Sequence, residues 1–127
     1  MDDLLAAATS ARQRAYVPYS GFAMGAAVRT ASGAIIPGAL VENVSLGLAM
    51  CAERVALFAT STAGERPVAL ALVARRTNGE LTHPCGACLQ VALELGGPDV
   101  EIVVSDPAGA TATATVAELL PRGPHRP

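Results

Sequence analysis

Three cysteines and one glutamate are the residues of this chain best suited to chemistry. Cys51 lies two positions before Glu53, and Cys85 and Cys88 form a C-x-x-C pair that follows Pro84. Two cysteines three residues apart at a helix start share one face and can bind the same ion. A third cysteine without a fourth leaves one coordination position open for water. The pattern therefore predicts a catalytic zinc site with Cys51, Cys85 and Cys88 as the metal ligands.

Glu53 and Arg54 directly follow the first cysteine segment and determine what such a site can do. A carboxylate beside the metal can take a proton from activated water and deliver it to a leaving nitrogen. Arg54 can donate to a cysteine sulfur and offset the negative charge of three thiolates. In isolation, Glu53 would be interpreted as a helix N-terminal charge and Arg54 as half of a surface salt bridge. Beside three cysteines, the chemical roles are favoured.

The elements that must position these residues alternate between helix and strand. Apolar spacing, turn residues and Gly or Pro stops predict helices over residues 2–15, 51–63, 85–95 and 116–120, and strands over 23–30, 34–41, 68–74, 100–105 and 110–114. In the second helix we expect Val55, Leu57, Phe58 and Ala59 to be buried. The order predicts one α/β domain over residues 1–121, a three-layer α/β/α fold with a mixed five-stranded sheet, and a disordered tail over 122–127.

The two cysteine segments each begin one of these predicted helices. The 33 residues between Cys51 and Cys85 are enough to bring both helices side by side on parallel strands. Helix N-termini favour thiolates by lowering the pKa of cysteine. We therefore expect the two segments to meet at one site.

Composition excludes several classes of partner. The net charge of −2 comes without a basic run, so a nucleic-acid polymer is not expected as a partner. The apolar stretches are shorter than the ~20 residues of a membrane span, and the start Met1-Asp2-Asp3 lacks the positive charge of a signal peptide. Three cysteines fit a metal in a reducing compartment better than a disulfide framework, which predicts a cytoplasmic protein. Only 3% of the chain is aromatic, so the core must be built from aliphatic side chains. Such a core favours close helix–sheet packing and an oligomer that completes the burial of apolar surface.

The segments C-A-E-R and P-C-G-A-C resemble the C-x-E…P-C-x-x-C signature of the zinc-dependent cytidine deaminases. The similarity extends over AYVPYSGFAMGAAV, GALVENVSLGLAMCAERVAL, PCGACLQVALELG and ELLP, and is closest to the short homotetrameric nucleoside deaminases. It implies that Cys51, Cys85 and Cys88 bind Zn²⁺ and that Glu53 shuttles protons. The implied reaction converts cytidine or deoxycytidine and water to uridine or deoxyuridine and ammonia, a step of pyrimidine salvage.

The resemblance also implies residues that contact the substrate. Phe22, in a loop that holds three of the four aromatic residues, matches the pocket aromatic of the family. Glu42 matches the carboxylate that binds a ribose hydroxyl, and the backbone and side chain around Ala52 match the part that meets the pyrimidine. The implied partners are a small aminopyrimidine nucleoside, water and, in a homotetramer, three further copies of the chain.

Departures from the family pattern concern the substrate. Leu40 occupies the position of an Asn and Leu46 that of a Tyr, the Phe that typically follows the C-terminal leucine-leucine-proline is missing, and Leu89 replaces a common Arg. A leucine cannot hydrogen-bond a sugar hydroxyl, and the loss of such a contact costs about 1–3 kcal/mol. Two enzyme hypotheses follow: deamination of cytidine or deoxycytidine, and deamination of a modified cytosine nucleoside (blasticidin S type) or another amino-substituted heterocycle.

A third hypothesis belongs to a different class: a zinc-binding module without catalysis. It predicts a metal site sealed by four protein ligands. Neither His83 nor His125 stands at an obvious ligand spacing to complete such a site. The missing fourth ligand and the presence of Glu53 both disfavour this hypothesis.

Overall fold

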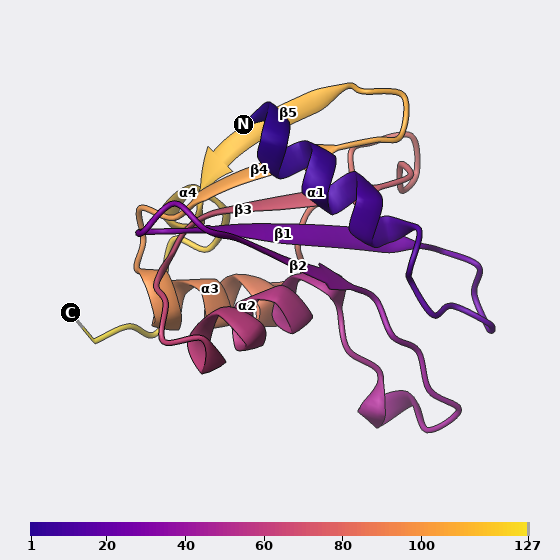
Figure 1. Cartoon of the computed structure of the whole chain (residues 1–127), viewed down its shortest axis with the longest axis horizontal. Coiled ribbons are helices and arrows are strands. Elements are labelled where there is room, and N and C mark those ends of the chain that lie inside the picture. Colours follow the sequence, from indigo (N-terminus) through magenta and orange to yellow (C-terminus); the bar gives the residue numbers. More distant parts are fainter. Residues whose placement is uncertain (127) are drawn as a thin grey trace.

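A mixed five-stranded sheet forms the centre of the protein, whose structure is a computed structural model that describes residues 1–126 (Figure 1). The strands are β1 (Met24–Thr30), β2 (Ile35–Ala39), β3 (Pro67–Ala74), β4 (Glu101–Ser105) and β5 (Thr111–Thr115). They lie in the order β2-β1-β3-β4-β5, and only the β3–β4 pair is parallel. The predicted mixed five-stranded sheet is confirmed.

Helices cover both faces of this sheet. Helix α1 (Asp2–Arg12) lies on one face, and α2 (Ala52–Thr62) and α3 (Gly86–Gly96) lie side by side on the other (Figure 1). The short α4 (Val116–Leu119) adds Val116 to the core on the α2 and α3 side. The arrangement confirms the predicted three-layer α/β/α fold.

Alternation along the strands divides the core into two layers. The side toward α2 and α3 holds larger side chains, and the side toward α1 is built mostly from alanine and valine. The strand residues of the first layer are Ala26, Val28, Leu70, Leu72, Ile102 and Val104, and those of the second are Ala27, Ala69, Ala71, Val73 and Val103. The small residues of the second layer let α1 lie close to the sheet.

Two glycines in the strands permit the closest contacts between sheet and helices. A Cβ at Gly25 would overlap the backbone of Ala8 and Arg12 in α1. A Cβ at Gly38 would lie 2.5 Å from the amide nitrogen of Ala56 in α2. Gly38 therefore determines how near the first turns of α2 come to β2.

Helix α1 ends three residues before its predicted end, at Arg12 instead of residue 15. The reason is a pair of backbone hydrogen bonds formed by Tyr16. Its amide donates to the Leu40 carbonyl (2.8 Å), and its carbonyl accepts from the Glu42 amide (2.8 Å). The chain leaves the helix to make these contacts with the segment that follows β2.

The expected burial of Leu57 is confirmed, and Val55 is only half-buried. The expected burial of Phe58 and Ala59 is wrong, because both are exposed and Phe58 is 44% accessible. The buried face of α2 consists of Ala52, Glu53, Ala56, Leu57 and Thr60. The small side chains of Ala52 and Ala56 let the helix pack directly against the sheet.

The C-terminal segment contacts α3. The Gln90 side chain donates to the carbonyl oxygen of Pro124 (2.8 Å). Pro127, the last residue of the predicted disordered tail, lies outside the described residues, and disorder over 122–127 stays a prediction. Within residues 1–126, no helix has the length and apolar character needed to cross a membrane.

Candidate active site

The topology brings the two cysteine segments together. The chain enters β3 from α2 and leaves it into α3, so both helices begin at the end of the sheet where β3 finishes. Cys51 is the N-cap of α2 and Cys85 is the N-cap of α3, as predicted. Ligand sites in α/β sheets commonly lie at the carboxyl ends of strands. The functional site is therefore expected at the starts of α2 and α3.

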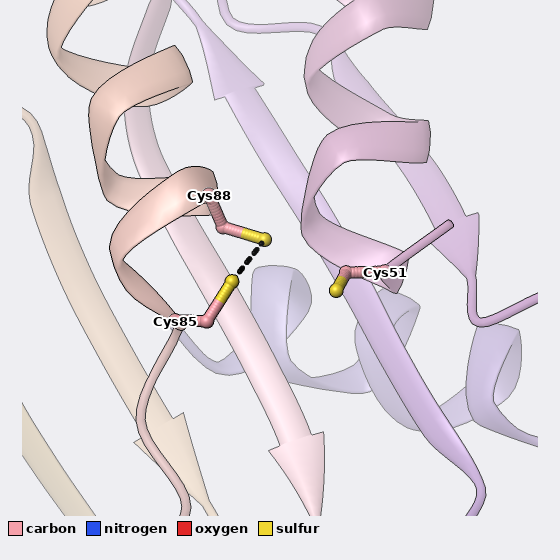
Figure 2. A group of neighbouring side chains, drawn as sticks. All are labelled: Cys51, Cys85 and Cys88. Atoms are coloured by element: carbon pink, nitrogen blue, oxygen red, sulfur yellow. Dashed lines mark hydrogen bonds between the residues drawn. The ribbon is translucent and has the colours of Figure 1, made fainter. Parts of the chain in front are cut away.

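The three cysteines converge at this place (Figure 2). Their Sγ atoms all lie within 4.8 Å of one another, and those of Cys85 and Cys88 are 3.4 Å apart. Three sulfurs bound to zinc at about 2.3 Å in tetrahedral geometry are separated by about 3.8 Å. All three cysteines are free of disulfides. The predicted ligand set is thus assembled with spacings that fit a zinc ion.

The thiols interact with one another and with Arg54. The Arg54 guanidinium donates from Nη2 to Cys51 Sγ (3.4 Å). Hydrogen bonding from Cys88, assisted by Arg54, lowers the pKa of the Cys51 thiol to about 5. The same interaction with Cys51, together with burial, raises the pKa of Cys88. Cys51 therefore becomes a thiolate more readily than Cys88, and the thiolate is the form that binds metal.

Glu53 lies beside these thiols and is almost completely buried, with 1% of its surface accessible. Its Oε1 atom has no hydrogen-bond partner among the described residues. Burial, together with the charge of Cys51, raises the pKa of this carboxyl to about 7. A carboxyl that gains and loses a proton near neutral pH is suited to general acid–base catalysis.

A turn over residues 19–22 holds the Glu42 carboxylate. The amides of Tyr19 and Ser20 donate to Glu42 Oε1 (3.0 and 3.2 Å), and the amide of Phe22 donates to Ser20 Oγ (3.0 Å). The Ser20 hydroxyl and the two amides lower the pKa of Glu42, so its carboxylate is ionised at neutral pH. The structure brings Glu42 and Phe22 to the same turn, although they are 20 positions apart in sequence.

Leu40 and Ala52 lie deeper in the structure. The Leu40 amide donates to the Met24 carbonyl (3.1 Å), and its half-buried side chain packs against the core below α2 and α3. Ala52 is completely buried in the first turn of α2. Leu46, in contrast, lies in the loop after Val41 and is 85% exposed. The three positions thus differ in depth within this chain.

The sequence analysis missed one residue at this end of the sheet, Arg75. Its Cζ atom lies 4.8 Å from the centroid of the Phe22 ring. The pairing of Met24 with Ala74 brings the start of β1 next to the end of β3, and so places the two side chains together. The sequence signal that could have identified Arg75 is a cation directly after a buried strand.

His83 does not belong to the sulfur cluster. It is exposed and faces the Leu81 carbonyl (3.1 Å).

Three converging thiols and one buried carboxyl on an α/β/α sandwich define a metal-dependent hydrolase with an open coordination position. Residues 1–104 match the family model described as the cytidine and deoxycytidylate deaminase zinc-binding region. The chain belongs to this family, and it is a zinc-dependent deaminase.

Individual relatives agree with the family. The chain is 44% identical to a cytidine deaminase of Halalkalibacterium halodurans over 118 residues, which cover 93% of this chain and 89% of that protein. It is 49% identical to a cytidine deaminase of Mycobacterium tuberculosis over 96 residues (75% and 71%). The crystal structure of a Burkholderia pseudomallei cytidine deaminase superposes with a TM-score of 0.89 at 45% identity, and covers 96% and 97% of the two chains.

Proposed function

We propose that the protein deaminates cytidine and deoxycytidine by hydrolysis, giving uridine or deoxyuridine and ammonia. The observation that carries this proposal is the buried Glu53 carboxyl, unpartnered beside three converging thiols. The similar proteins cited above are named cytidine deaminases. A structural zinc module has no use for a buried carboxyl with a pKa near neutrality.

The residues of this chain divide the chemical work. Cys51, Cys85 and Cys88 would hold the zinc, and Arg54 keeps Cys51 ionised by donating to its sulfur. When bound, zinc supplies the Lewis acidity that makes water a nucleophile at neutral pH. Glu53 accepts a proton from the attacking water and donates one to the departing amine. The carbon–nitrogen bond breaks, a carbon–oxygen bond replaces it, and ammonia leaves.

Substrate contacts form the second part of the proposal. The Glu42 carboxylate would accept a hydrogen bond from a sugar hydroxyl, since its Oε1 is already fixed by backbone amides. Phe22 and the first turn of α2 at Ala52 would bound the space for the pyrimidine. The Leu40 side chain offers no hydrogen bond and packs against the core, which favours a modified cytosine nucleoside as the second candidate substrate.

Assembly as a homotetramer is proposed as well. Large apolar side chains remain exposed on the loop that projects between Val41 and Met50 (Figure 1) and on α2; they are Val44, Leu46, Leu48 and Phe58. Surface of this kind is typical of protein–protein contacts. Sedimentation analysis should give four times the chain mass, and a monomer at micromolar concentration would contradict the assembly.

The proposed compartment is the cytoplasm, with a role in pyrimidine salvage there. The three free cysteines support this compartment, because cysteines stay reduced in the cytosol.

The decisive experiment replaces Glu53 with Gln, which keeps size and removes the titratable proton. Glu53→Gln should retain zinc and fold but release ammonia from cytidine about 10²–10⁴ times more slowly. Glu94→Gln, an exposed change on α3, is the matched control and should match the parent protein. A parent protein that holds zinc but releases no ammonia from any cytosine compound would refute the proposal in favour of a non-catalytic module.

A further inference from the structure

The segment between β3 and α3, residues 75–84, leads directly to one of the three thiols. It ends at Cys85, which is exposed and caps α3 with extended backbone (φ −70°, ψ 167°). Cys88 lies inside the first turn of α3 and is completely buried, so the helix itself fixes its position. Figure 2 shows Cys85 at the point where the incoming chain meets the helix. The position of the Cys85 sulfur therefore depends on the segment that precedes it.

The segments before the two N-cap cysteines are held in different ways. Before Cys51, the Met50 amide donates to the Val41 carbonyl (2.9 Å), and the Val41 amide donates to the Met50 carbonyl (3.1 Å). Within the described part of the chain, residues 75–84 form no such backbone pair with another element. Leu81 packs against the core, but an apolar contact is not directional. A directional contact between this segment and the sheet must come from a side chain.

Arg76 makes that directional contact. Its Nε donates to Asp106 Oδ2 (2.9 Å), and its Nη1 donates to the Gly79 carbonyl (3.1 Å). Val73 pairs with Ser105 in the parallel β3–β4 ladder, so the residues that follow the two strands lie at the same edge of the sheet. Arg76 thus joins the segment after β3 to the end of β4.

Asp106 differs from an ordinary surface carboxylate. Its side chain is only 9% exposed. Its Oδ1 accepts from the Ala110 amide (3.0 Å), and its own amide donates to the Ala110 carbonyl (3.1 Å). Exposed ion pairs stabilise little, because two flexible side chains must be ordered and water screens their charges. Here the turn between β4 and β5 already orders one partner, so the pair can hold Arg76 in one place.

Hydrogen bonds within the segment extend this restraint towards Cys85. Thr82 Oγ1 donates to the Arg75 carbonyl (2.7 Å) and forms a second hydrogen bond with Thr77 Oγ1 (2.7 Å). These bonds join the second half of the segment to the residues on either side of Arg76. Thr82 lies three positions before Cys85. A displacement of Arg76 would therefore reach the Cys85 thiol through a short, internally bonded stretch of chain.

We propose that Arg76, held by Asp106, is a positioning residue of the metal site: it fixes the segment that places the Cys85 thiol, and so slows the loss of zinc. Arg76 acts through this segment and not by contact with the ion. Replacing a residue that orients a metal ligand typically weakens metal binding about 10- to 100-fold. The inference rests on the proposed role of Cys85 as a ligand, and it is independent of which substrate is deaminated.

The test measures how fast the zinc-loaded full chain releases its metal to excess chelator, at a temperature well below unfolding. We expect Arg76→Gln to release zinc about tenfold faster than the parent protein. Arg66→Gln is the matched control, because Arg66 Nη2 donates to the Gly96 carbonyl (2.7 Å) at the far end of α3 from Cys85. It also loses an arginine hydrogen bond but should release zinc at the parent rate. Arg122→Gln, which removes a charge from an exposed position after α4, should do the same.

A double-mutant cycle tests whether the pair, and not each residue alone, retains the metal. Asp106→Asn should release zinc faster than the parent protein, because it removes the charge opposite Arg76. The double variant Arg76→Gln/Asp106→Asn should be no faster than the faster single variant, since the same contact is lost only once. Arg76→Lys, which keeps the charge, should be slower than Arg76→Gln.

Three results would overturn the role of Arg76. The first is zinc release from Arg76→Gln that is as slow as from Arg66→Gln. The second is a double variant in which the effects of the two single changes multiply, and the third is equal release from Arg76→Lys and Arg76→Gln. If Arg76→Gln does not fold, Asp106→Asn decides against the same control, and release at the control rate overturns the proposal.

Cobalt(II) in place of zinc separates this inference from the assignment of the ligands. Thiolate ligands give cobalt(II) a charge-transfer absorption whose intensity rises with their number. The parent protein should show the absorption of three thiolates; fewer would refute the ligand set and the inference with it, whereas ammonia release tests the reaction separately. With equimolar cobalt(II), the absorption should be weaker in Arg76→Gln than in Arg66→Gln, because the Cys85 thiolate is held less firmly. Equal absorption in these two variants would overturn the positioning role and leave the ligand set intact.

Discussion

Gly38→Ala tests whether the close contact between β2 and α2 positions the metal site. The added Cβ would lie 2.5 Å from the Ala56 amide nitrogen and 2.6 Å from the Ala52 carbonyl oxygen. Both atoms are backbone, so they cannot turn away as a side chain can. The shorter distance is about 0.9 Å below the 3.4 Å at which ordinary contact begins. The first turns of α2 must therefore move by about 1 Å.

That movement is large compared with what a zinc site tolerates. Ligand distances in such sites hold to about 0.2 Å, and Cys51 caps the helix that would move. Overpacking of this kind costs about 1–3 kcal/mol. We expect Gly38→Ala to unfold at a temperature lower by about 3–6 °C for each kcal/mol, and to lose zinc to a chelator at a concentration at least about tenfold lower than the parent protein requires.

Gly47→Ala provides the matched control for this experiment. Gly47 lies in the exposed loop between Val41 and Met50, and a Cβ there meets no atom within 4 Å. Circular dichroism and a zinc–chelator competition on both variants measure the two expected effects. If Gly38→Ala is as stable and retains zinc as well as Gly47→Ala, the contact with β2 does not position α2, and the reasoning from Gly38 is wrong.

Three further predictions concern the ligands, the charge around them and the substrate pocket. Cys85→Ala should bind no stoichiometric zinc and should unfold at lower temperature, because metal binding and folding are coupled; a folded, zinc-replete variant by elemental analysis would exclude Cys85 as a ligand. Arg54→Gln removes the 3.4 Å hydrogen bond to Cys51 Sγ and should weaken zinc binding about 10- to 100-fold in a chelator competition; Arg122→Gln serves as its control, and unchanged affinity would exclude the proposed role of Arg54. Leu40→Asn should raise kcat/KM for cytidine about tenfold if it restores a sugar contact of about 1–3 kcal/mol; a decrease would indicate that the sugar site of this protein is built differently.

Local sequence signals were sufficient to predict most of the fold. Each predicted helix and strand exists, because turn residues and apolar spacing act over a few residues. The starts of α2 and α3 at Cys51 and Cys85 follow from such local patterns. The order of the strands did not, because β1 pairs with both β2 and β3 through contacts distant in sequence.

The parts of the site that sequence could not predict depend on those distant contacts. Arg75 meets Phe22 only because Met24 pairs with Ala74, and no spacing in the sequence records this. The exposure of Phe58 was missed for a related reason. Helix α2 has apolar residues on several faces, and only contact with the sheet determines that the face with Ala52, Ala56 and Thr60 is buried.

Glu53 connects the energetics of the fold to the proposed chemistry. A buried acceptor without a partner costs about 1–3 kcal/mol, and the pKa of about 7 means that its ionisation is also disfavoured. Arg54 Nε is buried without a partner at the same place. Two unpartnered buried groups are costly here, because the net free energy of unfolding of a domain is small. Replacing Glu53 by a residue that needs no partner would remove one of them. The presence of Glu53 in the first turn of α2 is therefore explained by the proton transfer that we propose for its carboxyl, and not by the stability of the fold.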